Sequence, residues 1–189
     1  MNNMDAIIIR MNRLSVIFAN VVRRFVLTIQ IIKSNYVNCT QTHSMNSKTA
    51  SIILVVIVIA CGLFLAETHQ ILSTNPIGIS IQVLSLLLMI WARVTFGIRS
   101  FHGAANTTAG DLVTSGPYKW MRNPIYTSLI FFIWAGVFSY ISVETIAAAI
   151  VITICLIGRA LIEEKFLLTA YPEYRAYAAK TKRIIPFLI

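Results

Sequence analysis

Charged residues are scarce in this chain: they make up only 12% of its 189 residues, against about 25% in a typical soluble domain. Hydrophobic residues make up 57% instead. This composition excludes an ordinary soluble domain. It predicts a multi-pass integral membrane protein of the all-α class, built as one polytopic helical bundle.

Cysteine is equally scarce, and the three cysteines show no metal-ligand or redox spacing. Cys61 and Cys155 fall inside apolar runs, where a thiol acts as a small buried hydrophobe. We therefore expect no disulfide framework and no metal site. Acidic residues are outnumbered by basic ones, which gives a net charge of +9. The basic residues flank apolar runs and no basic-aromatic module is present, so we expect no nucleic-acid partner.

Four apolar runs are long enough to cross a hydrocarbon core of ~30 Å. Arg93 and Arg159 are the charged residues within these runs, which extend over Thr49 to Ala66, Ile77 to Ile98, Ile125 to Val143 and Thr145 to Ile162. Basic residues gather before residue 49, between 99 and 124, and after 162, and they are absent from the connections over residues 67–76 and 139–144. Four spans put every basic segment on one side, which we expect to be cytoplasmic. The 99–124 loop and the C-terminal tail then meet at one membrane face and can form a site.

The N-terminal stretch over residues 5–33 mixes apolar with basic residues. At 100° per residue, the polar residues Arg10, Arg13, Asn20 and Arg24 fall on one side, which is an amphipathic helix pattern. We favour a helix on the membrane surface over a fifth span. The polar residues 34–48 resemble a linker. The expected organisation is therefore an N-terminal amphipathic helix and linker over residues 1–48, followed by a membrane domain over residues 49–189.

The most polar and turn-rich run extends from Asp111 to Tyr126. Gly116-Pro117 predicts a turn, because proline moves the preceding residue out of the helical region. Asn123-Pro124 predicts a helix start, with asparagine as the N-cap and proline at the first helical position. A helix N-terminus attracts anions, and Arg122 adds a full positive charge beside it.

Arg159 and Glu163 end the last apolar run. They are four residues apart and therefore share one helix face. An arginine at this depth is costly unless it is paired or faces a polar cavity. An ion pair within the helix explains both residues without any function. A functional site requires the pair to face the 111–126 loop, with Glu163 or Glu164 as partner of a cationic group, and it would suit a ligand that carries both an ammonium and a carboxylate.

Four motifs occur in a fixed order along the second half of the chain: Leu112-Val-Thr-Ser-Gly-Pro-Tyr118, Arg122-Asn-Pro-Ile-Tyr126, Arg159 with Glu163-Glu164, and the tail runs Tyr171-Pro-Glu-Tyr-Arg-Ala-Tyr177 and Thr181-Lys-Arg-Ile-Ile-Pro186. Together they resemble the isoprenylcysteine carboxyl methyltransferase family. They are also similar to the wider group of integral membrane methyltransferases that includes phospholipid N-methyltransferases. The resemblance covers residues 80 to 189 and leaves out the N-terminal third.

The resemblance implies S-adenosylmethionine as the methyl donor and Arg159 as the catalytic residue on the substrate side. The residues that it places around the cofactor are Leu112, Val113, Tyr118, Arg122, Asn123, Pro124, Ile125, Tyr126, Glu163 and Glu164. The sequence departs from the family pattern in one place. Asn123 stands where the isoprenylcysteine enzymes usually have histidine, and asparagine cannot act as an acid or a base.

The expected reaction is methylation of the C-terminal carboxylate of an isoprenylated cysteine or a similar lipophilic carboxylate, reached from the membrane lipid. A carboxylate is already ionised, so catalysis needs alignment in a water-poor site and no base. Three alternatives remain. A membrane methyltransferase acting on a phospholipid amine or a small thiol would need a base, for which Glu164 and His102 are the candidates. A non-enzymatic channel or assembly factor would have no reason to keep the four motifs. A sterol-reductase-like relative would usually have more spans.

Overall fold

The computed structural model describes Arg23, residues 43–97 and residues 112–184. Within these residues the chain contains helices and no strand, as predicted. The elements are α2 (His43–Glu67), α3 (Pro76–Phe96), the 3₁₀ helix η2 (Gly116–Lys119), α4 (Pro124–Val137), α5 (Val143–Ala170) and α6 (Tyr174–Lys180). The predicted amphipathic helix over residues 5–33 lies outside the described residues, apart from Arg23.

Three of the four predicted spans are long apolar helices, at Thr49–Glu67, Pro76–Phe96 and Val143–Ala170. They confirm a helical membrane bundle. The span at Thr49–Glu67 is part of α2. Because α2 begins at His43, its N-terminal residues lie within the predicted linker over residues 34–48.

The fourth predicted span, α4, is also apolar but has 14 residues. At 1.5 Å per residue it is about 21 Å long, which is shorter than a ~30 Å hydrocarbon core. The prediction that this span continues to Val143 was wrong. α4 ends at Val137, and Ser142 then starts α5 through a reciprocal capping box with Thr145. The Ser142 hydroxyl accepts from the Thr145 amide, and the Thr145 hydroxyl accepts from the Ser142 amide.

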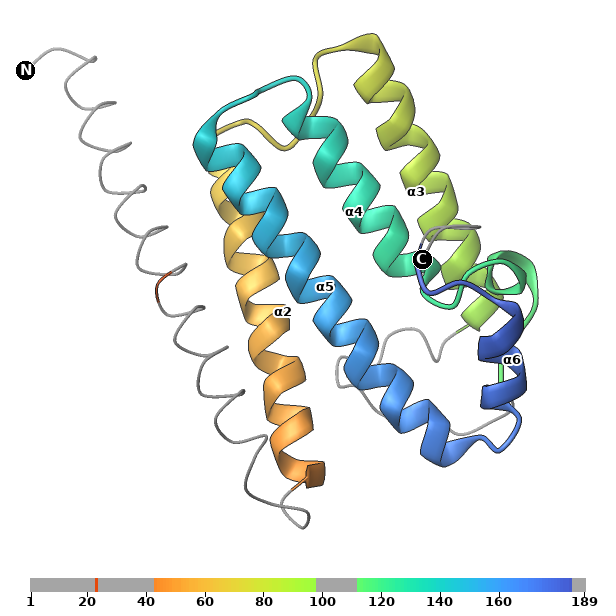
Figure 1. Cartoon of the computed structure of the whole chain (residues 1–189). Coiled ribbons are helices and arrows are strands. Elements are labelled where there is room, and N and C mark those ends of the chain that lie inside the picture. The colour runs from red at the N-terminus through yellow and green to blue at the C-terminus, as the bar shows by residue number, and fades with distance from the viewer. Residues whose placement is uncertain (1–22, 24–42, 98–111, 185–189) are drawn as a thin grey trace, which may run out of the picture.

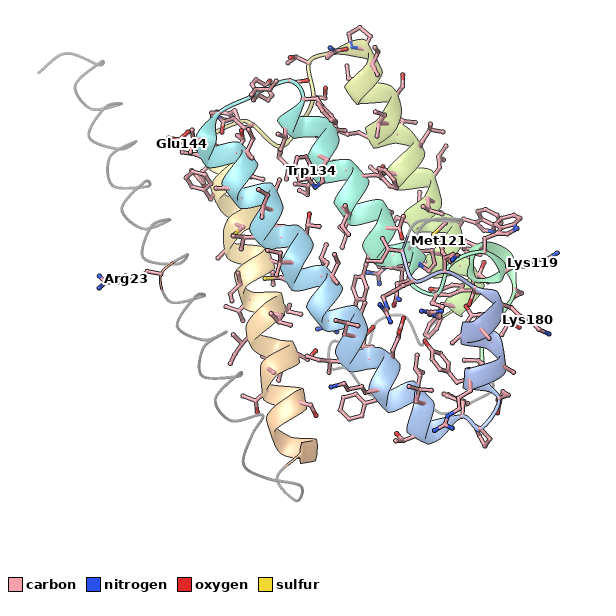
Figure 2. The ribbon with its side chains drawn as sticks, in the orientation of Figure 1. Arg23, Lys119, Met121, Trp134, Glu144 and Lys180 are labelled. Atoms are coloured by element: carbon pink, nitrogen blue, oxygen red, sulfur yellow. The ribbon has the colours of Figure 1, made fainter. Side chains whose placement is uncertain are left out.

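The long helices pack in the order α3, α4, α5, α2, with α4 against both α3 and α5 (Figure 1). The connection before α3 and the turn before α5 lie at one end of the bundle. η2 and α6 lie at the other end, as the charge pattern predicted. Figure 2 shows the exposed lysines Lys119 and Lys180 at that same end.

Small side chains allow α2 and α5 to approach closely. Ala148, Ala149 and Cys155 on α5 are fully buried, and Cys61 on α2 packs in the same core. Close approach of this kind is how helices associate where lipid removes the usual hydrophobic drive. The two apolar cysteines are therefore buried, as predicted.

The end of the bundle away from η2 is closed by a neutral hydrogen-bond network around Gln82 of α3. Its amide oxygen accepts from the Ser73 backbone at 3.0 Å, and its amide nitrogen donates to the carbonyls of Ile71 and Phe132 at 2.8 and 3.2 Å. A buried amide that is fully bonded stabilises this end. The charged clusters described below lie instead where η2, α4, α5 and the tail meet.

Candidate functional site

The predicted turn at Gly116-Pro117 is confirmed and begins η2. Gly116 has φ +57, a left-handed conformation that other residues rarely adopt, and a Cβ there would lie 2.6 Å from the Thr95 hydroxyl oxygen. Glycine therefore lets the chain turn tightly against the end of α3. The turn places the Tyr118 ring against Phe96, with centroids 5.6 Å apart.

The C-terminal tail pairs with the segment between η2 and α4. The Arg122 amide donates to the Lys182 carbonyl at 2.7 Å, and the Asn123 amide donates to the Arg183 carbonyl at 3.1 Å. The predicted meeting of the central loop and the tail is therefore present among the described residues. Backbone pairing of this kind fixes the register between the two segments.

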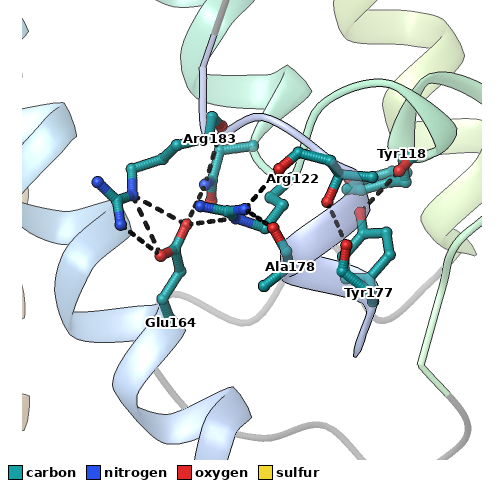
Figure 3. Close-up of polar contacts among 8 residues, drawn as sticks. Tyr118, Arg122, Glu164, Tyr177, Ala178 and Arg183 are labelled. Carbon is teal, nitrogen blue, oxygen red and sulfur yellow. Dashed lines mark hydrogen bonds and ion pairs between the residues drawn. The ribbon is translucent and has the colours of Figure 1, made fainter. Parts of the chain in front are cut away.

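Glu164 of α5 is the centre of a buried charged cluster where this segment and the tail cross (Figure 3). Its Oε1 accepts from Arg122 Nε at 3.0 Å, and its Oε2 accepts from Arg183 Nη2 at 3.0 Å. Arg122 Nη1 also donates to the carbonyls of Ala178 and Thr181 at 2.7 and 2.6 Å. Arg122, which we expected to add positive charge at an anion site, thus has two of its nitrogens committed to protein acceptors.

Asn123 occupies the N-cap position before Pro124, but the prediction that its side chain caps α4 was wrong. Its amide nitrogen donates to Glu164 Oε1 at 3.3 Å and to the Arg183 carbonyl at 3.2 Å. The carboxylate and the carbonyl are acceptors, so the asparagine side chain turns toward them with its donor end. The predicted first helical position, Pro124, is confirmed.

Arg159 and Glu163 form the predicted pair on one face of α5, with Arg159 Nε 3.1 Å from Glu163 Oε1. The Tyr126 hydroxyl of α4 lies between them. It accepts from Arg159 Nε at 2.6 Å and donates to Glu163 Oε1 at 2.7 Å. The arginine side chain is 9% exposed and the glutamate side chain 27%. Burial of the arginine is compensated by these contacts, and Glu163 is the more accessible member.

The two clusters divide the predicted site residues. The Glu164 cluster contains Glu164, Arg122 and Asn123. The Arg159 cluster contains Arg159, Tyr126 and Glu163. The remaining predicted residues lie beside them: Leu112 and Val113 are half-buried before η2, Tyr118 is in η2, and Pro124 and Ile125 begin α4.

Sequence reasoning missed two participants, Arg183 and Ser51. Arg183 stands inside a tail motif that was recognised, and its charge could have marked it as a partner of the glutamate pair. Ser51 bonds Arg159 from α2, with Nη1 to Oγ at 3.1 Å. It is a serine in an apolar run, and no local signal distinguishes it.

Three tyrosines of η2 and α6 lie near the Glu164 cluster: Tyr118 and Tyr174 are buried, and Tyr177 is half-buried. Burial raises the pKa of the Tyr118 and Tyr174 hydroxyls above their ordinary value, and it raises the pKa of Tyr177 to about 12. Hydrogen bonds to Glu164 raise the pKa of Arg183. The phenols are therefore neutral at physiological pH, and Tyr177 donates to the Tyr118 carbonyl at 2.7 Å. Among the described residues, the buried Tyr174 hydroxyl has no hydrogen-bond partner.

Residues 73–174 match the family model described as phospholipid methyltransferase. The chain belongs to this family. The matched residues of this phospholipid methyltransferase family member run from just before α3 to the start of α6, so they include the Arg159–Glu163 pair and Glu164. Ser51 precedes them and Arg183 follows them. The membrane methyltransferase resemblance found in the four motifs is thereby confirmed.

A curated relative is the cobalt-zinc-cadmium resistance protein CzcN of Cupriavidus metallidurans, which is 28% identical over 138 residues. The alignment covers 72% of this chain and 62% of the relative. The chain therefore spans less than two thirds of the length of that relative. No solved structure matches the chain.

Proposed function

We propose that this protein transfers a methyl group from S-adenosylmethionine to the C-terminal carboxylate of an isoprenylated cysteine or a similar lipophilic carboxylate. Membership of the phospholipid methyltransferase family supports methyl transfer. The Arg159–Tyr126–Glu163 cluster is the observation that favours a carboxylate as the acceptor. It presents a buried guanidinium in the second half of α5, next to Glu163, which we place on the cofactor side.

The residues near this cluster fit the chemistry of the cofactor. Bound S-adenosylmethionine supplies an electrophilic methyl group on a sulfonium, and it also carries an ammonium and a carboxylate. Glu163 is the partly exposed carboxylate suited to the ammonium. Neutral Tyr118 can donate a hydrogen bond on the Glu163 side. The buried Tyr174 hydroxyl, which lies at the Glu164 cluster, is a donor with no protein partner among the described residues. The half-buried Leu112, Val113 and Ile125 would supply apolar contact.

The Glu164 cluster serves as the frame of this cofactor site. Glu164 joins Arg122 and Asn123 on one side to the tail on the other, and Pro124 starts α4 directly beside them. We assign these residues to the cofactor side because they determine the position of Tyr126 and of the α4 N-terminus. They are Glu164, Arg122, Asn123 and Pro124. The partial positive charge of the α4 N-terminus then faces the same region and suits the cofactor carboxylate.

A carboxylate acceptor agrees with the groups available for proton transfer. An amine acceptor must lose a proton, and Glu164 was one of two candidate bases for that step. Both of its oxygens already accept hydrogen bonds from Arg122 and Arg183, so it is suited to anchoring rather than to proton transfer. The other candidate, His102, lies outside the described residues.

Arg159 would hold the acceptor carboxylate and orient it toward the methyl group. Its guanidinium is buried and fixed by Tyr126 and Glu163, so little reorganisation is needed on binding. Transfer would break the methyl–sulfur bond of the sulfonium and form a methyl–oxygen bond, so that a carboxylate and a sulfonium would become an uncharged ester and an uncharged thioether. A water-poor site favours that loss of charge. The basic end of the bundle, with η2 and the tail, would be the cytoplasmic catalytic face.

The second candidate acceptor is a phospholipid amine, which the family's description favours. A single assay separates the two. The protein, reconstituted in lipid, is given methyl-labelled S-adenosylmethionine and either an N-acetylated S-prenylcysteine, phosphatidylethanolamine or an alkyl thiol. Mild alkali releases methanol from a methyl ester and leaves N-methyl and S-methyl products intact. We expect alkali-labile label on the prenylcysteine, lost in Arg159→Ala. Label on phosphatidylethanolamine alone would favour the second candidate, and folded protein that labels no acceptor would contradict methyl transfer.

A further inference from the structure

A serine of α2 reaches the guanidinium at the candidate site. Arg159 Nη1 donates to the Ser51 hydroxyl oxygen at 3.1 Å and lies 3.5 Å from the Ser51 carbonyl oxygen. Ser51 is fully buried. It comes from the helix that packs along α5, 108 residues earlier in the chain (Figure 1). α2 thus supplies a polar contact to the cluster that Tyr126 of α4 forms with Arg159 and Glu163 of α5.

Other serines in the long helices show what a hydroxyl does without such a partner. Ser80 and Ser85 of α3 donate to the carbonyls of Pro76 and Ile81, one turn earlier in their own helix, at 2.9 and 2.7 Å. That local bond is the usual solution for a serine inside a helix. Ser51 differs because its oxygen accepts from a charged donor. Hydrogen bonds from ionised donors are the stronger class, particularly away from water.

The contact from Ser51 adds a second held nitrogen to the guanidinium. Tyr126 and Glu163 both contact Nε, so they fix one nitrogen of the group. Ser51 contacts Nη1, a second nitrogen of the same planar fork. A rigid plate held at two points cannot turn freely about either one. The direction in which the fork points is therefore set jointly by α2, α4 and α5.

We propose that Ser51 is a positioning residue for Arg159, and that α2 forms part of the site although it precedes the residues that match the family model. Ser51 holds the guanidinium in the rotation needed to receive a carboxylate. The inference rests on the proposed transfer to a carboxylate acceptor. Misalignment of a reactant lowers the reaction rate far more than it lowers binding affinity. We therefore expect loss of the Ser51 hydroxyl to reduce turnover.

One experiment reads the positioning without any methyl transfer. Nuclear magnetic resonance of ¹⁵N-labelled arginine follows rotation about the Nε–Cζ bond of Arg159, whose signals are identified by their loss in Arg159→Lys. We expect Ser51→Ala to accelerate this rotation several-fold. Ser85→Ala deletes the same atom from another buried serine and should leave it unchanged. Unchanged rotation in Ser51→Ala would overturn the proposal. If that variant does not fold, Ser51→Cys replaces it, because a thiol is a weak acceptor of similar size.

The second measurement is the kinetics of transfer to the lipophilic carboxylate. Loss of a hydrogen bond to a charged group predicts a fall in kcat of roughly ten-fold or more in Ser51→Ala. Cofactor affinity should stay within about two-fold of wild type, since the Ser51 hydroxyl bonds the substrate-side arginine and no residue that we place on the cofactor side. Ser51→Thr keeps the hydroxyl and should recover most of the rate. Rate, affinity and thermal stability falling together would make Ser51 a packing residue and overturn the proposal. A wild-type protein that methylates no acceptor would reject the proposed function, while the rotation measurement still decides the positioning.

Discussion

Arg122 and Glu164 lie 42 positions apart in the sequence, and their side chains meet in a buried ion pair with Nε 3.0 Å from Oε1. This contact ties the segment before α4 to the end of α5. Arg183 on the other carboxylate oxygen adds the tail. Glu163, the next residue, turns instead to Tyr126 and Arg159. Two adjacent glutamates therefore have different contacts: Glu164 joins the segment before α4 to the tail, and Glu163 faces Tyr126 and Arg159.

Removal of the Glu164 carboxylate should release the tail. In Glu164→Ala, Arg122 keeps its buried charge and loses its ionic partner, and breaking a buried pair in this way costs about 3–5 kcal/mol. We expect a clearly lower thermal midpoint in detergent, and faster tryptic cleavage after Lys182 and Arg183. Glu173→Ala, at an exposed position in the same region, is the matched control and should behave as wild type. A Glu164→Ala protein with normal stability and a protected tail would show that the cluster does not hold the tail.

The tail should also loosen in alkali. Burial raises the pKa of Tyr177 to about 12, above that of an exposed tyrosine near 10. Below both values the phenol is protonated in the folded and the unfolded chain. As pH rises past 10, the unfolded chain loses the proton first, so stability falls. We expect the thermal midpoint to drop between about pH 10 and 11.5, with a smaller slope in Tyr177→Phe. Equal slopes in the two proteins would contradict this account of Tyr177.

The long apolar helices could be predicted from the sequence because each follows from a local signal, whereas α6 was not predicted. Lack of charge over a sufficient length marked the long spans, and Pro124 and the Gly116-Pro117 pair marked a helix start and a turn. The end of α4 could not be predicted in this way. Residues 138–143 carry no charge either, so lack of charge could not mark the end of the helix. The chain turns after Val137, where the Ser139 and Tyr140 amides donate to the Gly136 and Val137 carbonyls, and the capping box at Ser142 then starts α5.

The site was predictable where its residues share one helix and unpredictable where they do not. The four-residue spacing of Arg159 and Glu163 placed them on one face, and the structure confirms their pairing. The side-chain direction of Asn123 depends on an acceptor from α5, and the contact of Ser51 depends on which helix packs beside α5. Neither piece of information is present in local sequence. Residue spacing therefore predicts contacts within one helix but not contacts between helices.

The orientation in the membrane can be tested with single cysteines at exposed positions. Lys119 and Lys180 lie at the η2 and α6 end of the bundle (Figure 2). Thr74 lies in the connection between α2 and α3, which is at the opposite end (Figure 1). In a protein whose own cysteines are replaced, a membrane-impermeant thiol reagent should reach positions 119 and 180 from the cytoplasmic side and position 74 from the other. Labelling of 119 and 180 from opposite sides would reject the shared face, and with it the proposed site.

Arg159 and Glu163 could form a purely structural ion pair, because their side chains are in contact. Separate substitution of each residue distinguishes that role from the proposed binding of substrate and cofactor. A purely structural pair predicts similar damage from the loss of either member. The site that we propose predicts different damage. Glu163→Ala should weaken cofactor affinity roughly ten- to a hundred-fold, because a charged hydrogen-bonding partner contributes about 1.5–3 kcal/mol.

Arg159→Ala should leave cofactor affinity nearly unchanged and reduce turnover of a carboxylate acceptor. Arg159→Lys should restore little, because a point charge cannot reproduce the planar fork that Tyr126 and Ser51 hold. The measurements are cofactor affinity by calorimetry and the methyl-transfer rate for each variant, with thermal stability to correct for unfolded protein. Suppose instead that both alanine variants only lower stability, and that binding and rate per folded molecule stay at the wild-type level. The pair would then stabilise α5 and α4 without contacting either reactant, and the assignment of Arg159 and Glu163 to the site would be wrong.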